Sequence, residues 1–129
     1  MAEVTVRCPV NPSEDEEKVR KAVLSIFPDA ELSLEDGILS GPATLDRFHR
    51  IIRNQRILDA TRSVLIRNMR GDSTCISLNK QVATLGKVSF ADRNPVLGAI
   101  EVTIRDDDIQ PVVDRLAPTT VDGEEVHPS

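Results

Sequence analysis

The sequence predicts an α+β domain in which a mainly antiparallel sheet is covered on one face by two helices. Three segments alternate apolar and polar residues with the period of two that half-buried strands show. Two longer segments repeat apolar residues at helical spacing. A chain of 129 residues can bury one hydrophobic core. We therefore expect a single domain over residues 1–118, followed by a polar tail at residues 119–129.

The strands are predicted from alternation and from turn chemistry. Alternation is clear over residues 4–10, 74–78 and 100–104. Asp36-Gly37 separates two short apolar runs, which predicts a β-hairpin with a type I′ turn. We expect the inward side chains to share one core with the helices; its predicted members are Val6, Ile76, Ile100, Val102, Val23, Phe27, Phe48 and Ile52.

The segment Ser13–Phe27 predicts the first helix. Ser13 begins a capping box, and apolar residues then recur at helical spacing up to Pro28, which ends the helix. Several glutamates precede a basic residue by four positions, as Glu14 precedes Lys18, and such pairs stabilise a helix. These charges therefore require no partner outside the helix.

The segment Thr44–Arg70 is the longest stretch with helical periodicity. Thr44 is a candidate N-cap, and Gly71 is a candidate residue just beyond the helix end. The apolar stripe of the second half is rotated by about a third of a turn from the stripe of the first half. We therefore predict a kink, a 3₁₀ turn or two separate helices, with the change of direction within residues 53–57.

The same long segment is strongly basic. It contains seven arginines and two aspartates, a net charge of +5, whereas the rest of the chain has nine Lys and Arg against 19 Asp and Glu, a net charge of −10. A basic helix in an acidic protein indicates a polyanionic partner, although arginines on a helix can equally form a solvated face. The candidate binding arginines are Arg47, Arg50, Arg53 and Arg56.

A second candidate binding element lies between Asn79 and Lys87. The pattern predicts one or two helical turns closed by Gly86. Lys80 and Lys87 flank these turns and could hold a phosphate at the free N–H groups of the helix start, but surface lysines without a ligand fit equally well. Asn79 and Gln81 could contact a base edge or a ribose hydroxyl, and capping or strand-end hydrogen bonds are the alternative.

The C-terminal part predicts a turn, a strand and a short helix. Asn94-Pro95 is typical of a turn, and the acidic run Asp106–Asp108 leads into the helix Ile109–Leu116. Consecutive aspartates point in different directions, so this run favours the positive end of the helix dipole over a magnesium site. The tail beyond Pro118 fits either a frayed end or a short β-ribbon.

The residue types for catalysis and for base stacking are scarce. Cys8, Cys75, His49 and His127 show no metal-ligand spacing and no nucleophile–base pattern, so we expect a protein that is not an enzyme and has no cofactor or metal. With three Phe and neither Trp nor Tyr, the chain lacks an aromatic platform for bases. No secretory leader and no membrane-spanning run is evident, which favours a cytoplasmic protein that does not enter a membrane.

Several runs, spread over nearly the whole chain, resemble an uncharacterised archaeal protein family. They are the Glu-rich helix ending in Ile26-Phe27-Pro28, the run Gln55-Arg56-Ile57-Leu58-Asp59, the pattern Asn79-Lys80-Gln81…Gly86-Lys87…Phe90, and Leu97-Gly98-Ala99-Ile100. Members of that family are described as RNA-binding proteins with the α+β fold of the ribosomal protein that binds the smallest large-subunit rRNA. Some relatives carry a P-loop nucleotide-kinase-like domain before this domain. The sequence has no such phosphate-binding motif, so the resemblance implies a stand-alone form.

We therefore expect a non-catalytic domain that binds structured RNA through phosphate and shape contacts. Arginine side chains suit phosphate because they donate two parallel hydrogen bonds. The sequence pI of about 5.0 favours the alternative, which is a protein-interaction or homodimeric module, accessory to a P-loop kinase-like protein.

Overall fold

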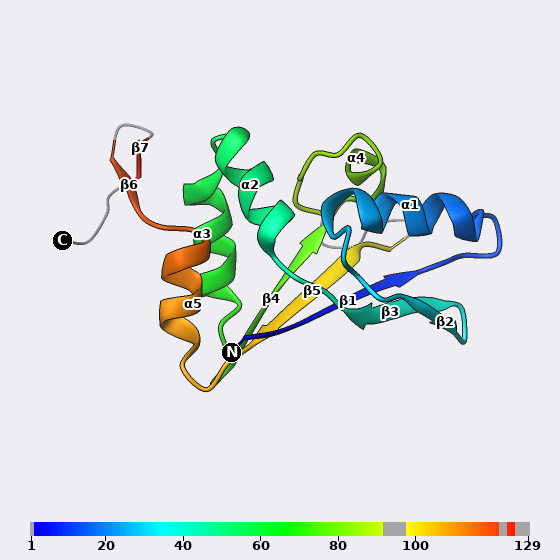
Figure 1. The fold of residues 1–129 in the computed structure, drawn as a ribbon, viewed down its shortest axis with the longest axis horizontal. Helices are drawn as coiled ribbons and strands as arrows, with labels where there is room; N and C mark the ends of the chain where they lie inside the picture. Colours follow the sequence, from blue (N-terminus) through cyan, green and yellow to red (C-terminus); the bar gives the residue numbers. More distant parts are fainter. Residues whose placement is uncertain (1, 92–97, 122–123, 126–129) are drawn as a thin grey trace.

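A five-stranded antiparallel sheet underlies the helices (Figure 1), in a computed structural model that describes residues 2–91, 98–121 and 124–125. The strand order is β2-β3-β1-β5-β4. The strands are β1 (Glu3–Pro9), β2 (Ser33–Glu35), β3 (Ile38–Pro42), β4 (Ser73–Leu78) and β5 (Ile100–Arg105). The helices are α1 (Glu16–Ile26), α2 (Asp46–Asn54), α3 (Leu58–Arg67), α4 (Lys80–Ala83) and α5 (Ile109–Leu116). The predicted α+β class is confirmed.

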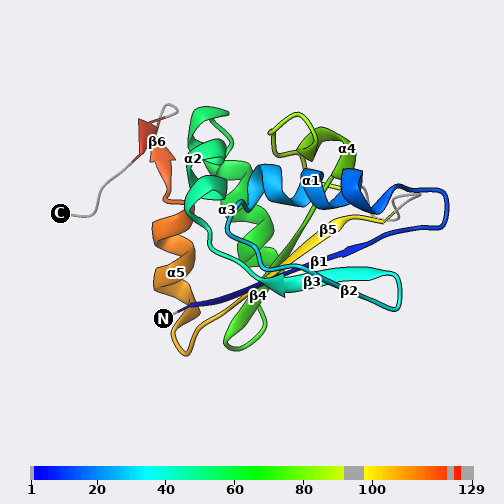
Figure 2. The same cartoon turned by 45° about the vertical axis from the view of Figure 1, so that its right-hand side comes forward.

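The sheet has one buried face and one exposed face. Val6 of the central strand β1 lies opposite Val102 of β5, and Ile76 of β4 lies opposite the same residue from the other side. All three side chains are buried, whereas the residues directly before and after each of them in its own strand are exposed. The period-two alternation in the sequence therefore reports the two faces of this sheet. Figures 1 and 2 show the helices on one side of it.

The predicted core is confirmed. Each of its eight members belongs to one cluster of buried residues. Phe27, at the end of α1, stacks on Phe48 of α2 with ring centroids 5.8 Å apart. Because both rings are fully buried, this contact fixes α2 beside α1 over the sheet.

The long basic segment is interrupted at the predicted place. Helix α2 ends at Asn54, and α3 begins at Leu58. Between them Arg56 has a φ of 58°, the left-handed region that non-glycine residues rarely adopt. The interruption lets the apolar stripes of both helices face the same core, which one straight helix could not do. We call residues 55–57 the elbow.

The predicted helix caps are wrong at three positions. Asp15, and not Ser13, caps α1, because the turn that precedes the helix is closed by Glu14 N–H donating to Asn11 O. The Thr44 hydroxyl donates to the Asp29 carboxylate instead of capping α2. At the end of α3, Asn68 is the C-cap. Gly71 has a φ of 59° in the turn that joins Arg70 to Ser73.

The remaining turns and the tail agree with the sequence where the structure describes them. Asp36 and Gly37 have φ values of 52° and 76°, as a type I′ hairpin requires. The tail contains a short ribbon of β6 (Thr120–Val121) and β7 (Glu124–Glu125). The predicted turn at residues 94–95 lies outside the described residues. Among the described helices, none has the length and apolar character to cross a membrane.

Candidate nucleic-acid interface

The outer face of α2 carries three of the candidate arginines. Arg47, Arg50 and Arg53 are all exposed, opposite the buried Phe48 and Ile52. Residues three apart on a helix lie on neighbouring positions of one face, so the guanidinium groups form a row along α2. An open depression on this face is lined by Asp46, His49, Arg50, Arg53 and Asn54.

The elbow carries a fourth exposed arginine. Arg56 is exposed, and its left-handed backbone conformation sets it at the point where the chain turns from α2 to α3. Gln55 reaches in the other direction. Its amide nitrogen donates to the Val88 carbonyl oxygen at 2.9 Å, and its amide oxygen accepts from the Val88 N–H at 2.7 Å. The elbow is thereby tied to a segment 33 residues later in the chain.

Lys87 lies next to this tie. Its side chain is exposed, whereas the following Val88 is buried. Gly86, with a φ of 72°, ends the turn after α4 and directs the chain toward the elbow. The structure therefore brings Lys87 to the elbow with Arg56, although the sequence separates them by 31 positions. We call Arg47, Arg50, Arg53, Arg56 and Lys87 together the basic surface.

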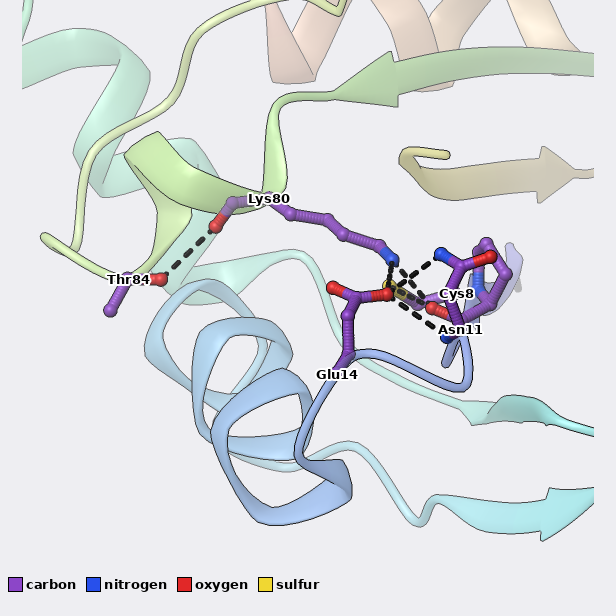
Figure 3. A network of polar contacts seen from close by, with 6 residues as sticks. Cys8, Asn11, Glu14, Lys80 and Thr84 are labelled. Carbon is purple, nitrogen blue, oxygen red and sulfur yellow. Dashed lines mark hydrogen bonds and ion pairs between the residues drawn. The ribbon is translucent and has the colours of Figure 1, made fainter. Parts of the chain in front are cut away.

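Lys80 is buried apart from this surface, so the alternative of an ordinary surface lysine is wrong, whereas its role in RNA binding stays a prediction. It is 7 % exposed, and its ammonium group points toward the end of β1 (Figure 3). Lys80 Nζ donates to the Pro9 carbonyl oxygen at 2.6 Å and forms an ion pair with Glu14 Oε1 at 2.9 Å. Glu14 lies in the turn before α1 and pairs with a residue of α4, contrary to the prediction of an i,i+4 pair with Lys18. A phosphate near Lys80 would be repelled by this carboxylate, which already neutralises the ammonium group.

Glu14 and Cys8 are both affected by this buried pair. Burial alone would raise the pKa of Glu14, but hydrogen bonds from Asn11 and Lys80 outweigh it and lower the pKa below its ordinary value. The same Glu14 oxygen accepts from the Asn11 backbone and side chain at 3.0 and 2.8 Å. Burial raises the pKa of the Cys8 thiol to about 11. Cys8 is therefore an unreactive core residue.

Asn79 and Gln81 have different environments. Asn79 is the N-cap of α4, where its side-chain oxygen accepts from Val82 N–H at 3.0 Å. The capping alternative therefore accounts for its position. Gln81 is exposed and lines a pocket of about 300 Å³ between α1 and α4, together with Lys18 and Thr84. It is the remaining polar candidate of this turn, on a different face from the elbow.

Two further arginines of the basic segment stabilise the fold. Arg62 of α3 forms an ion pair with Asp114 of α5 at 2.7 Å and donates to the Ala117 carbonyl oxygen at 3.2 Å. Arg70 donates to the Met69 carbonyl oxygen at 2.9 Å beyond the end of α3. Part of the positive charge of residues 44–70 therefore belongs to helix packing and helix termination.

Aromatic and metal-binding groups contribute little to this surface. Phe27 and Phe48 are fully buried, and Phe90 packs against the core. Within residues 2–91, 98–121 and 124–125, no group of three or more His, Cys, Asp or Glu residues is placed to hold a metal ion. The chemistry that the surface offers is therefore that of guanidinium and ammonium groups.

Sequence reasoning missed Gln55 as a functional candidate. Its two hydrogen bonds go to the backbone of Val88, and a backbone partner leaves no trace in residue type. The available signals were its position in the predicted interruption and its place in the run from Gln55 to Asp59 that resembles the family.

Comparisons with known proteins identify the family. A family model described as RNA binding matches residues 3–105. The chain is 44% identical over 128 residues to a UPF0200/UPF0201 protein of Archaeoglobus fulgidus, but it spans only 40% of that protein's length. It is 37% identical over 132 residues to a UPF0201 protein of Metallosphaera sedula, with 95% of this chain and 92% of the relative covered.

A solved structure supports the same conclusion. The crystal structure of a UPF0201 protein from Methanococcus jannaschii matches with a TM-score of 0.86 at 34% sequence identity, over 97% of this chain and 99% of that chain. The Methanococcus jannaschii protein therefore shares both sequence and fold with the chain across nearly its whole length. The chain therefore belongs to the family described as RNA binding, and within it to the UPF0201 proteins of archaea.

Proposed function

We propose that the protein binds structured RNA through the phosphates that the basic surface can reach. The observation that carries the proposal is the grouping of five exposed cations from α2, the elbow and the loop before Val88 on an otherwise acidic protein. The description of the family as RNA binding supports the same ligand class.

The residue types favour contacts to phosphate over contacts to bases. Guanidinium groups donate paired hydrogen bonds to phosphate oxygens, and their charge attracts the backbone of any sequence. Sequence-specific recognition of single strands depends on aromatic stacking, and both Phe27 and Phe48 are buried. A folded RNA that presents several phosphates at fixed spacing fits such a surface best.

The acidic remainder of the protein limits where RNA can bind. Outside residues 44–70 the net charge is −10, so a polyanion is repelled from most of the chain. We infer that binding is confined to the basic surface and is non-catalytic. We further infer that the protein is cytoplasmic and has the fold of the ribosomal protein that binds the smallest large-subunit rRNA. The competing proposal is a homodimeric or kinase-associated interaction module, for which the exposed Leu85 is the best apolar contact.

The proposal is tested by titrating the protein with an RNA hairpin whose stem is fully paired, at several salt concentrations. With three to five phosphate contacts, the logarithm of the binding constant should fall against log salt with a slope of about −2 to −5. Replacing Arg47 and Arg50 together by Glu should weaken binding to hairpins of different sequence alike and should flatten the slope. Neither side chain has a hydrogen bond or ion pair within the described residues, so the fold should persist.

Arg67→Glu is the matched control, because Arg67 is exposed near the far end of α3 and is not part of the basic surface. It makes half the charge change on the same basic segment. An absence of salt-sensitive binding by the wild type would refute the proposal. So would a fall in log K for Arg67→Glu of about half the fall for the double variant, because the binding would then follow net charge and not this surface.

A further inference from the structure

We infer that Gln55 is a positioning residue of the basic surface, which holds Lys87 where it contacts the same RNA as the arginines of α2. The inference rests on the proposed function and goes beyond it, because Gln55 itself contacts no ligand. It concerns one side chain that joins two segments of the surface.

The geometry of the tie is specific. One carboxamide group satisfies both the N–H and the C=O of Val88, at 2.7 and 2.9 Å. This pairing copies the two hydrogen bonds that a neighbouring β-strand residue would make. Both the direction and the distance of the Val88 backbone relative to the elbow are therefore fixed, which an apolar contact between the two segments would not achieve.

The tie acts on the loop at the residue after Lys87. Upstream, Gly86 N–H donates to Ala83 O at 2.8 Å, so the loop is anchored to α4 on that side. Val88 is 4 % exposed and anchors the other side in the core. Lys87 lies between the two anchors with its side chain exposed. Without Gln55, the loop would keep its hydrogen bonds from Lys87 N–H to Val82 O and from Asn79 N–H to Ser89 O, but Val88 would lose its direct hydrogen bonds to the elbow.

The elbow supplies the second cation of this part of the basic surface, Arg56. Arg56 directly follows Gln55, so one cation lies next in sequence to each end of the tie. Neither Arg56 nor Lys87 has a side-chain hydrogen bond or ion pair within the described residues. Two like charges repel when they are held close, and a phosphate between them removes this repulsion. A phosphate that contacts both Arg56 and Lys87 would therefore bind more tightly when the tie holds their backbones together.

Coupling between Gln55 and Lys87 in RNA binding tests this role. In the wild type, Lys87→Ala should lower the affinity for a paired RNA hairpin by about 3- to 10-fold at low salt, the loss of one phosphate contact. In a Gln55→Met background, where both hydrogen bonds are absent at nearly the same side-chain length, Lys87→Ala should cost less than about 2-fold. Arg47→Ala should cost the same in both backgrounds, because α2 does not depend on the tie.

Two further variants separate positioning from general stability. Gln110→Met removes a glutamine that is hydrogen-bonded to Asp114 on α5, far from the elbow in sequence, and should leave the effect of Lys87→Ala unchanged. Gln55→Asn keeps the amide but is one methylene too short to reach both groups of Val88, and should act like Gln55→Met. It serves as the background if Gln55→Met does not fold, as judged by circular dichroism.

The outcomes distinguish this inference from the proposed function. If the wild type binds the hairpin and Lys87→Ala has the same effect with and without Gln55, the positioning role is overturned while RNA binding by the basic surface stands. If the wild type shows no salt-sensitive affinity, the proposed function fails and this inference fails with it. A reduced effect of Lys87→Ala in both Gln55 backgrounds supports the inference.

Discussion

The ammonium group of Lys80 lies 2.9 Å from the carboxylate of Glu14, 66 residues earlier in the chain, and both side chains are largely withdrawn from solvent. Together with the bond from Lys80 to the Pro9 carbonyl oxygen, this pair joins the start of α4 to the end of β1 and to the turn before α1. The pair is a connection within the fold, and the first two predictions concern its effect on stability.

Lys80→Met should destabilise the protein by about 3–5 kcal/mol, because it leaves the Glu14 carboxylate buried without its counter-ion. Chemical denaturation followed by circular dichroism measures the change. Lys21→Met is the control, since Lys21 is exposed on α1, and its effect should stay within about 0.5 kcal/mol. A loss below about 1 kcal/mol for Lys80→Met would show that the pair contributes little to folding.

The pH dependence of stability should carry the signature of Glu14. Its pKa in the folded protein is lowered from the ordinary value of 4.5, so the ionised form contributes stability that is fully present above that value. The contribution should disappear as the pH falls through the lowered pKa. The wild type should therefore lose its advantage over Glu14→Gln below about pH 4.5. An advantage that stays constant down to pH 2 would contradict the assignment.

Gly41→Ala should destabilise the protein by more than about 2 kcal/mol, through displacement of backbone. A Cβ at this position would overlap the carbonyl oxygen of Glu31, and no flexible side chain is available to yield. Gly71→Ala provides the comparison. Its Cβ would meet nothing within 4 Å, so only the left-handed φ of 59° opposes it, at about 1–2 kcal/mol. Thermal or chemical unfolding of the two variants should rank them in this order.

The two cysteines should differ in reactivity. Cys75 is exposed on β4, whereas Cys8 is buried and its pKa is raised to about 11 by burial. Near pH 8 a maleimide should add once to the folded protein, at Cys75, and a second time only after denaturation. Mass spectrometry of the wild type and of Cys75→Ser, each folded and denatured, measures how many maleimide groups have been added. Rapid modification of folded Cys75→Ser would mean that β1 opens far more readily than its burial indicates.

Local patterns in the sequence predict the sheet faces and the elbow because these features depend on near neighbours. Val6 and Ile100 are identified as inward residues by alternation alone, and both are fully buried. The change of apolar stripe beyond Asn54 predicts the interruption, because each helix must turn its own stripe toward one core.

Local sequence patterns do not predict which distant segments come into contact. Nothing near Lys80 in the sequence shows that Glu14 will lie beside it, so a buried lysine resembles a surface lysine. Asp15, and not Ser13, caps α1, and the Glu14 carboxylate in the turn before the helix is held by Asn11 and by the distant Lys80. For the basic surface, the sequence supplies the arginines but not the Gln55 tie that adds Lys87.

The central place of β1 in the sheet has a consequence for the order of folding. Among the strands of this sheet β1 is synthesised before the others, yet one of its two neighbours is β5, in which Arg105 pairs with Glu3. The hairpin of β2 and β3 can form early on one side, while the other edge of β1 stays open until β5 has been synthesised. Contacts over such sequence distances slow folding and leave an unpaired edge available for wrong pairing meanwhile. Nascent chains released before residue 105 should therefore be prone to aggregation, however stable the finished protein is.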